Sequence, residues 1–340
     1  MTAQDPGGAA AAAPPVSRGE LAALGLLVLI GAVLRSYRLG DWPPGFHVDE
    51  AFNLLDAREM IQSGWRPVFL PANAGRADIY SYLQAPLLWI LGESVARARL
   101  ASALIGTLSI PLFWLTTRRL LAGDPALPPE RLRRLALLAA GFASLSLWHL
   151  HFSRFGIRAV LFPAVVSGVV LAWWEGVGAI LGSSHRPAPS PETGRGGAYV
   201  PIVPGKQPGM RERRNGLRSL LPLALLLGLA FYVHPAGRAL VLLPAAHALY
   251  LAWRLRDRRP LVLLGRAFAG ALLVAAPLLV FWWRHPATFS SHAGEVSILG
   301  QGPGGVWDNL LRVAGMFTVA GDGKPWRNLV TAEGLGRPVF

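Results

Sequence analysis

The sequence contains no cysteine and few charged residues. The absence of cysteine among its 340 residues excludes disulfides, thiolate metal sites and cysteine nucleophiles. Charged residues make up 15% of the chain, whereas about a quarter is usual for soluble domains. Acidic residues are the scarcer kind, 19 against 33 basic ones. The basic residues gather in short loops between apolar runs, so the net charge of +14 indicates membrane topology rather than binding to nucleic acid.

Apolar residues are abundant and stand in uncharged runs. They make up 52% of the chain, and segments 21–34, 220–233 and 268–283 contain no charge. With their flanks, such runs reach the roughly 20 apolar residues that cross a bilayer. We therefore predict an all-α integral membrane protein, a helical bundle of about seven spans. The spans are expected near residues 20–36, 98–117, 134–150, 157–181, 218–234, 238–253 and 261–283.

The basic loops predict which segments share one side of the membrane. Segment 82–92 is apolar, but it is too short to cross and contains Pro86, which favours a helix at the membrane interface. If it does not cross, the basic loops 118–134, 186–218 and 254–259 all lie on the side of the N-terminus, as cytoplasmic loops do. Segment 37–97 and the tail from residue 285 then lie outside.

This topology divides the chain into three regions. Residues 1–19 are expected to be a disordered cytoplasmic N-terminus. Residues 20–284 are expected to form a transmembrane domain in the cell membrane, with an outer loop at 37–97 and a flexible cytoplasmic loop at 182–218. Residues 285–340 are expected to be an extracytoplasmic loop or the start of a further region. Since they end without a closing element, we expect a fragment from which further spans are missing.

Two adjacent carboxylates, Asp49 and Glu50, lie in the outer loop beside His47. One interpretation is a solvated helix start, because "DEAFNLLDAREM" is typical of a helix and acids near its N-terminus favour the dipole. The other interpretation is a general base, since a carboxylate at the membrane surface can take a proton from a hydroxyl. A divalent ion held by these three residues is a weaker alternative, because ligands so close in sequence rarely converge.

Basic residues on the same outer face are candidates for binding an anionic substrate. Arg99 lies inside an apolar run, where a charge needs a partner. A phosphate would suit its two-point geometry, and Glu93 is the only acid close to it in sequence. The alternative is that such arginines are interfacial anchors whose stems lie along lipid. The candidate substrate-binding residues are His47, Arg76, Arg99, Arg158 and His234, within a rim that also holds Arg97, His149, His151, Arg154 and Arg238.

The order of these segments resembles a known family. "DEA" after the first span, then "GRADIYSYLQAPLLWILG" and "ARARLASALIGTLSIPLFWLTTRRL", is similar to bacterial relatives of protein O-mannosyltransferases, the glycosyltransferase family 39 group that includes the aminoarabinose transferase type. The resemblance covers residues 20–340. It implies a GT-C fold with a catalytic outer loop and interfacial helices, and an outward-facing active site.

The resemblance also implies a reaction. The donor would be a polyprenyl-phosphate-linked sugar, and the acceptor a hydroxyl of a glycan, lipid or protein. Asp49 would be the catalytic acid with Glu50 as its companion, and Arg99 would contact the lipid phosphate. No cofactor is implied. Aminoarabinose-transferase-like members carry Glu-Lys before the proline where this chain has Gln84 and Ala85, which argues against a metal site there and against the same substrate.

Two other functions remain open from the sequence. A transporter or lipid-linked sugar flippase would also be polytopic, but it would need ionisable residues near the bilayer midplane. Here the charges cluster at the ends of the predicted spans.

A purely structural membrane protein is the third interpretation, in which the basic rim only anchors the bundle. For a transferase, in-line displacement at the anomeric carbon predicts inversion.

Overall fold

The computed structural model describes residues 14–72, 75–122, 124, 126–182, 210–289, 305–308, 310–311, 329–330 and 336–337. Residues 1–13 of the predicted N-terminal region lie outside this part of the chain, as do residues 183–209 of the predicted cytoplasmic loop. Most of the predicted region 285–340 lies outside it too.

Helices form the bundle. In chain order the elements are α1 (Arg18–Ser36), α2 (Val48–Ser63), α3 (Tyr80–Leu91), α4 (Val95–Leu121), α5 (Pro129–Leu145), α6 (Leu147–Arg154), the 3-10 turn η1 (Arg158–Val160), α7 (Leu161–Gly182), α8 (Met210–Val233), the 3-10 turn η2 (Pro235–Ala239), α9 (Leu242–Leu255) and α10 (Arg259–Arg284). A two-residue strand β1 (Leu329–Val330) pairs antiparallel with β2 (Gly336–Arg337). The predicted all-α fold class is confirmed.

Five helical segments in the described residues are long and apolar enough to cross a membrane. They are Arg18–Ser36, Val95–Leu121, Arg158–Leu181, Pro235–Leu255 and Arg259–Arg284. The span predicted near 134–150 is instead a pair of helices, α5 and α6, bent by 51°. The span predicted near 218–234 falls in α8, whose described apolar stretch Leu220–Val233 is shorter than a span. The span predicted near 134–150 is therefore broken rather than straight, whereas the one predicted near 218–234 lies within the 24-residue helix α8.

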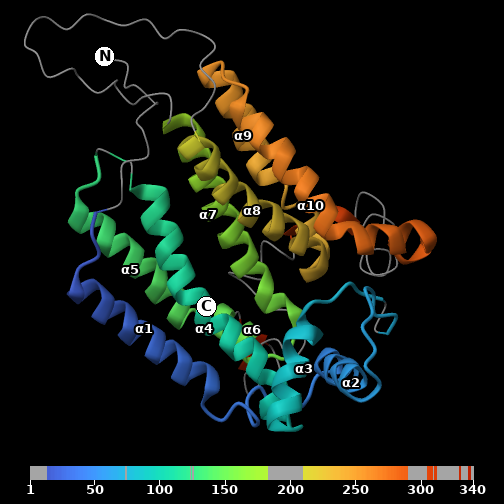
Figure 1. The fold of residues 1–340 in the computed structure, drawn as a ribbon. Coiled ribbons are helices and arrows are strands. Elements are labelled where there is room, and N and C mark those ends of the chain that lie inside the picture. Colours follow the sequence, from blue (N-terminus) through green and yellow to red (C-terminus); the bar gives the residue numbers. More distant parts are fainter. Residues whose placement is uncertain are drawn as a thin grey trace, which may run out of the picture.

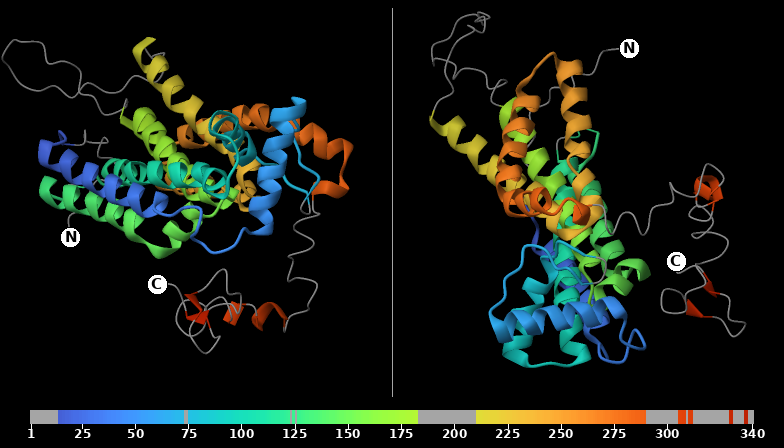
Figure 2. Two further views of the ribbon diagram at one scale, coloured as in Figure 1. Left: turned by 90° about the horizontal axis from the view of Figure 1, so that it is seen from below. Right: turned by 90° about the vertical axis from the view of Figure 1, so that its right-hand side faces the viewer.

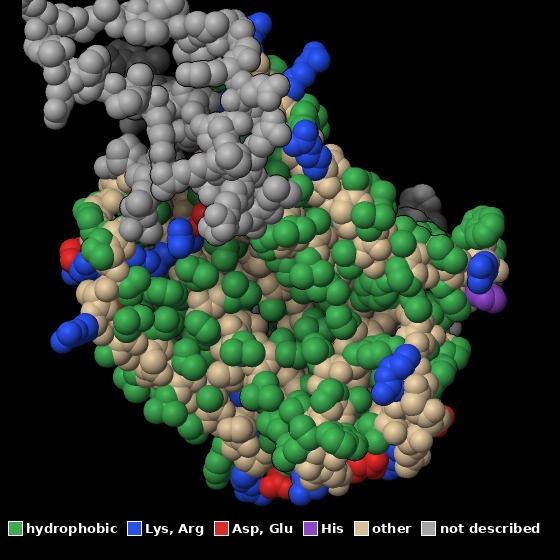
Figure 3. Space-filling model, viewed as in Figure 1, with side chains coloured by type: hydrophobic (Ala, Val, Ile, Leu, Met, Phe, Trp, Pro, Cys, Tyr) green, Lys and Arg blue, Asp and Glu red, His purple; other side chains and the backbone are tan. Residues whose placement is uncertain are grey.

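The bundle has two ends of different character. Helices α1, α4, α5 and α7 lie side by side, and α8 and α10 pack beyond α7 (Figure 1). The helix α2 runs across one end of the bundle, here called the α2 end (Figure 2, right). Hydrophobic side chains cover the middle of the face in Figure 3, and charged side chains gather towards both ends. This distribution is typical of a protein whose middle lies in a bilayer.

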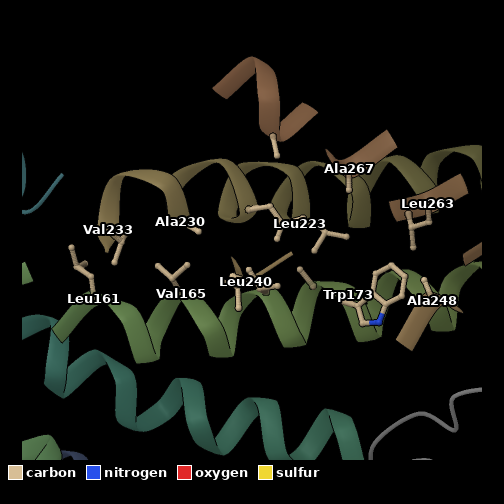
Figure 4. Close-up of a cluster of buried hydrophobic side chains, with 14 of the residues drawn as sticks. Leu161, Val165, Trp173, Leu223, Ala230, Val233, Leu240, Ala248, Leu263 and Ala267 are labelled. Atoms are coloured by element: carbon tan, nitrogen blue, oxygen red, sulfur yellow. The ribbon is translucent and has the colours of Figure 1, made fainter. Parts of the chain in front are cut away.

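The largest apolar core lies between α7, α8, α9 and α10 (Figure 4). Val165 and Trp173 of α7 face Leu223 and Ala230 of α8 across it, and all four are buried. Close approach of α8 and α10 depends on Gly228, where a Cβ atom would lie 2.5 Å from a side-chain atom of Val274. Small residues at such crossings let membrane helices pack with their backbones close together.

The break between α5 and α6 has a buried cation beside it. Arg35, in the last turn of α1, is 0% exposed and donates hydrogen bonds to the carbonyls of Ala143 (2.7 Å) and Ser144 (3.2 Å). It also contacts His149 Nδ1 at 2.8 Å. The last carbonyls of any helix lack intrahelical partners, and an unsatisfied carbonyl away from water is costly. Arg35 therefore caps α5 from the neighbouring helix and stabilises the bend.

Candidate functional site

The residues proposed from the sequence all lie at the α2 end. His47, Asp49 and Glu50 form the N-terminus of α2, which begins at Val48 and ends at Ser63, before Gly64 in the left-handed conformation (φ 74°). The remaining four come from the loop before α3, the first turns of α4, the 3-10 turn η1 and the connection between α8 and α9. These four are Arg76, Arg99, Arg158 and His234.

The start of α2 is fixed by a reciprocal capping arrangement. The imidazole Nδ1 of His47 accepts a hydrogen bond from the backbone N–H of Asp49 at 3.2 Å. The carboxylate of Glu50 accepts one from the backbone N–H of His47 at 2.9 Å. Such a capping box satisfies N–H groups that have no partner within the helix. The helix start predicted from "DEAFNLLDAREM" is confirmed.

Glu50 and Arg99 form an ion pair in which both side chains are 0% exposed. Arg99 Nε donates to Glu50 Oε1 at 2.7 Å, and Nη2 donates to Oε2 at 3.0 Å. The same guanidinium donates to three loop carbonyls, those of Leu39 (3.1 Å), Pro43 (2.8 Å) and Gly45 (2.6 Å). A guanidinium has five N–H donors, and here all five have protein acceptors.

This geometry corrects two expectations about Arg99. It has no N–H left for a donor phosphate, so the direct phosphate contact expected of it does not fit. Its partner is also not Glu93, which forms a surface ion pair with Arg58 (Nε–Oε1 2.9 Å). The sequence does not reveal Glu50 as the partner, because Glu50 lies 49 residues earlier in the chain. Arg99 instead holds the α1–α2 loop against α4.

Glu50 also fastens the connection between α6 and η1. Its Oε1 accepts the backbone N–H of Gly156 at 2.9 Å, and Asn53 Nδ2 donates to the carbonyl of Gly156 at 2.8 Å. A Cβ atom at position 156 would lie 3.2 Å from the carbonyl oxygen of Ala98 and 3.3 Å from Glu50 Oε1. Sequence reasoning missed Asn53 and Gly156, since neither carries a charge. Through these hydrogen bonds Glu50 positions α2, α4 and the loop between α6 and η1 relative to one another.

Arg76 is buried as well, and it joins α2 to the loop before α3. It forms an ion pair with Asp56, its Nη2 donates a hydrogen bond to Asn53 Oδ1 (3.1 Å), and its Nε lies 3.4 Å from Asp78 Oδ2. Asp78 in turn accepts the backbone N–H of Tyr80 at 2.7 Å, at the start of α3. Burial raises the pKa of the Asp56 carboxyl, while the charge and hydrogen bond of Arg76 act in the opposite direction. These contacts favour a structural role for Arg76.

Asp49 is in a different environment from its neighbour. Its side chain is 44% exposed, and its Oδ2 lies 3.5 Å from His47 Nδ1. It also interacts electrostatically with Arg158 at the start of η1. The two adjacent carboxylates are thus separated by the fold, because Glu50 points into the protein and Asp49 remains accessible. Of the pair, only Asp49 can meet a substrate.

Besides the ion-paired Arg76, two further arginines line a narrow cleft at the α2 end. Arg158 and Arg238 line it together with His234 and Phe289, between the loop before α3 and the α8–α9 connection. Arg238 lies over the rings of Trp282 (4.5 Å) and Phe289 (4.7 Å). The two guanidiniums repel each other electrostatically. Two like charges at one cleft make a site that an anion would stabilise. The sequence places Arg238 in the basic rim, but nothing in the sequence distinguishes it there as a site residue.

The cation Arg158 has fewer protein acceptors than Arg99 in the part of the chain that the structure describes. Among the described residues its guanidinium makes one hydrogen bond, from Nη1 to the carbonyl of Ala77 at 3.3 Å. The cation Arg154 differs, because it donates to the carbonyls of Tyr37 (2.7 Å) and Trp42 (3.0 Å) and so secures the α1–α2 loop.

The described residues contain no group of three His, Asp or Glu side chains that could hold a metal ion. His47, Asp49 and Glu50 are not such a group in this geometry. The reason is geometric, since both oxygens of Glu50 already accept hydrogen bonds from Arg99 and from backbone N–H groups.

Comparison with known proteins bears on the fold. No family model and no curated protein matches the sequence. Among solved structures, the chain is similar to the S. cerevisiae protein O-mannosyltransferase Pmt1–Pmt2 complex bound to the sugar donor, with a TM-score of 0.55 and 16% identity. The alignment covers 81% of this chain and 35% of that chain. The protein has the GT-C fold.

Within this GT-C bundle, α3 is tied to α4 next to the buried ion pair. Gln84 is 0% exposed, and its Nε2 donates to the carbonyl of Ala98 at 2.7 Å. The hydroxyl of Tyr80 lies 2.8 Å from Ser102 Oγ. Gln84, which stands where aminoarabinose-transferase-like members are expected to carry an acid, thus makes a neutral contact that helps to hold α3 in place.

Proposed function

We propose that this protein is a membrane glycosyltransferase that moves a sugar from a polyprenyl-phosphate donor to an acceptor hydroxyl. The observation that carries the proposal is the pairing, in a GT-C bundle, of an accessible carboxylate with a cationic cleft. Asp49 supplies the carboxylate, and Arg158 and Arg238 supply the cations. The reaction takes place at the α2 end, which faces the outside of the cell membrane.

Each step of the reaction has a residue suited to it. The acceptor oxygen attacks the anomeric carbon while the bond from that carbon to the phosphate oxygen breaks, and its electron pair leaves with the phosphate. Asp49 takes the proton of the acceptor hydroxyl. Arg158 and Arg238 stabilise the negative charge that develops on the phosphate. Attack opposite the leaving group inverts the anomeric centre.

The remaining site residues position these groups. Glu50 and Arg99 hold the N-terminus of α2 against α4, which sets the place of Asp49. His47 caps the same turn, with its Nδ1 directed at the backbone N–H of Asp49. His234 lines the cleft beside Arg238, where it can contact the sugar or the phosphate. The proposal thus keeps Asp49, Arg158 and His234 near the substrate and assigns Glu50, Arg76 and Arg99 to the supporting structure.

The sidedness of the proposal rests on charge. The end opposite the α2 end carries basic residues in the last turn of α4, Arg118 and Arg119, and in the first turns of α5 and α10. Cytoplasmic ends of spans are enriched in such residues. The α2 end then faces outside, where a lipid-linked donor remains anchored in the bilayer while its sugar reaches Asp49.

The distribution of ionisable residues favours this function over a transporter. The charges of α1, Arg18, Glu20 and Arg35, lie in its first and last turns, and the basic residues of α4 include two in its last turn. Arg35 is buried, but its donors are occupied by carbonyls at the α5 break. A transporter would need such groups beside a substrate path near the middle of the spans.

The proposal is tested by sugar transfer in membranes that contain the full chain. Membranes with the wild-type protein, Asp49→Asn or Asp41→Asn are supplied with radiolabelled polyprenyl-phosphate sugars, and label in acceptors is measured. Asp41 is a matched control because it is an exposed acid at the same end, paired with Arg38 (2.9 Å). We expect transfer by the wild type and Asp41→Asn and none by Asp49→Asn. No transfer from any donor by the wild type, or equal transfer by all three, would contradict the proposal.

A further inference from the structure

A second groove lies at the α2 end, away from the candidate active site. It has a volume of about 430 Å³ and runs between the last turns of α2 and the middle of α3. Its lining residues are Met60, Ile61, Arg66, Tyr82, Ala85, Pro86 and Trp89. Asp49 and Met60 are eleven residues apart on one helix, a separation of roughly 16 Å at 1.5 Å per residue. A donor whose phosphate lies in the Arg158 cleft therefore does not place that phosphate in this groove.

The groove is lined by apolar side chains, among them Met60, Pro86 and Trp89, together with the polar groups of Tyr82 and Arg66, and its rim carries one cation. Arg66 is exposed, and its Nη1 donates to the carbonyls of Met60 (2.5 Å) and Trp65 (2.8 Å), which holds the side chain beside the groove. Among the described residues its Nη2 and Nε atoms make no hydrogen bond. The guanidinium therefore keeps three N–H groups for an anion at the mouth of an apolar channel.

The helix α3 presents its apolar end to the surroundings. Trp89 is 73% exposed and Ile90 69%, and Leu91 is also exposed. The helix has 12 residues, fewer than a span requires. An exposed tryptophan with neighbouring aliphatic side chains is typical of the membrane–water interface. The groove therefore opens at the depth where phospholipid headgroups meet their acyl chains.

We propose that this groove binds an anionic membrane phospholipid, with the phosphate on Arg66 and an acyl chain between α2 and α3. The apolar lining of Met60, Pro86 and Trp89 fits the chain, and the single positive charge at the rim is complementary to an anionic headgroup. A lipid bound there fills the space between α2, which carries Asp49 at its other end, and α3. The site is independent of the transfer chemistry.

The absence of cysteine makes a direct test possible. Ala85→Cys places one thiol in the groove, and Gln62→Cys places one on the exposed side of α2 as a control. Each full-length protein is reconstituted in nanodiscs of phosphatidylcholine, with or without phosphatidylglycerol, and the rate of reaction with the uncharged N-ethylmaleimide is measured. We expect phosphatidylglycerol to slow the reaction of the groove thiol several-fold and to leave the control thiol unchanged.

The anionic selectivity is tested with Arg66→Gln, and Arg97→Gln serves as the matched control because Arg97 is an exposed arginine at the same end. Native mass spectrometry measures the retention of phosphatidylglycerol relative to phosphatidylcholine. We expect Arg66→Gln to lower this ratio about fivefold, as for one basic residue near an anionic headgroup, and Arg97→Gln to leave it unchanged. Equal protection by both lipids, an unchanged ratio in Arg66→Gln, or protection by polyprenyl phosphate alone would overturn the proposal. None of these outcomes depends on sugar transfer.

Discussion

Replacing Glu50 with glutamine tests whether this residue acts by holding the site together. The change keeps the shape of the side chain, but it removes the charge opposite Arg99 and turns one acceptor oxygen into an NH₂ group. Glu50 accepts hydrogen bonds from Arg99, from the backbone N–H of His47 and from that of Gly156. The new NH₂ group would face some of these donors. It would also leave the guanidinium, which is 0% exposed, without a counter-ion.

The expected loss of stability is large. Removing one partner of a buried ion pair costs about 3–5 kcal/mol, out of a typical total of roughly 5–15 kcal/mol. Glu93→Gln is the matched control, because it removes a carboxylate from the surface pair with Arg58, and exposed pairs contribute little. We expect thermal unfolding in detergent micelles to begin at a clearly lower temperature for Glu50→Gln than for the wild type, and Glu93→Gln to unfold close to the wild type.

A second substitution separates structure from chemistry. In the double variant Glu50→Gln/Arg99→Met the buried charge is gone, so the combined loss of stability should be smaller than the sum of the two single losses by about 0.5–3 kcal/mol. The reasoning would be refuted if Glu50→Gln unfolded like Glu93→Gln and yet lost sugar transfer. That outcome would make Glu50 a reacting group rather than a positioning residue.

The remaining predictions concern the cleft, the loop at its side and the α5 break. Arg158→Gln and Arg238→Gln should each weaken donor binding by about 10-fold to 150-fold, equivalent to a charged hydrogen bond of roughly 1.5–3 kcal/mol. Titration with labelled donor measures this affinity, and an unchanged affinity would mean that the phosphate binds elsewhere. Gly156→Ala should lower stability by about 1–3 kcal/mol through overpacking, whereas Gly141→Ala should not, because the nearest atom to its added Cβ lies 3.9 Å away; equal unfolding temperatures would count against the tight contact. Arg35→Met should cost about 1–3 kcal/mol for each carbonyl left unsatisfied, and an unchanged unfolding temperature would show that the α5 break needs no cap from α1.

The fold was largely predictable from local signals. Uncharged runs located the helices that cross the bundle, and "DEAFNLLDAREM" located the start of α2. The break between α5 and α6 was not predictable, because Ser146 leaves the helical conformation (ψ 119°) without a proline or glycine to mark it. The cap that stabilises the break, Arg35, comes from more than a hundred residues away in the chain.

The site was predictable as a set of residues but not as a set of roles. The basic rim and the acidic pair do meet at one end, as their positions at span ends indicated. Which arginine remains available depends on partners distant in sequence, as the pairing of Arg99 with Glu50 demonstrates. Position within an apolar run indicated that Arg99 needs a partner, but it could not distinguish a protein carboxylate from a phosphate. Only the packed structure separates Arg99 from Arg158.

The central claim is that Asp49 acts as the base in sugar transfer, and it is tested most directly by measuring binding and chemistry separately. Purified Asp49→Asn protein is compared with the wild type for donor affinity and for the rate of a single turnover with saturating donor and acceptor. Loss of a general base predicts donor affinity close to that of the wild type and a transfer rate lower by about 10²–10⁴-fold. A single-turnover rate near that of the wild type would contradict the account, because no proton acceptor would then be needed at Asp49.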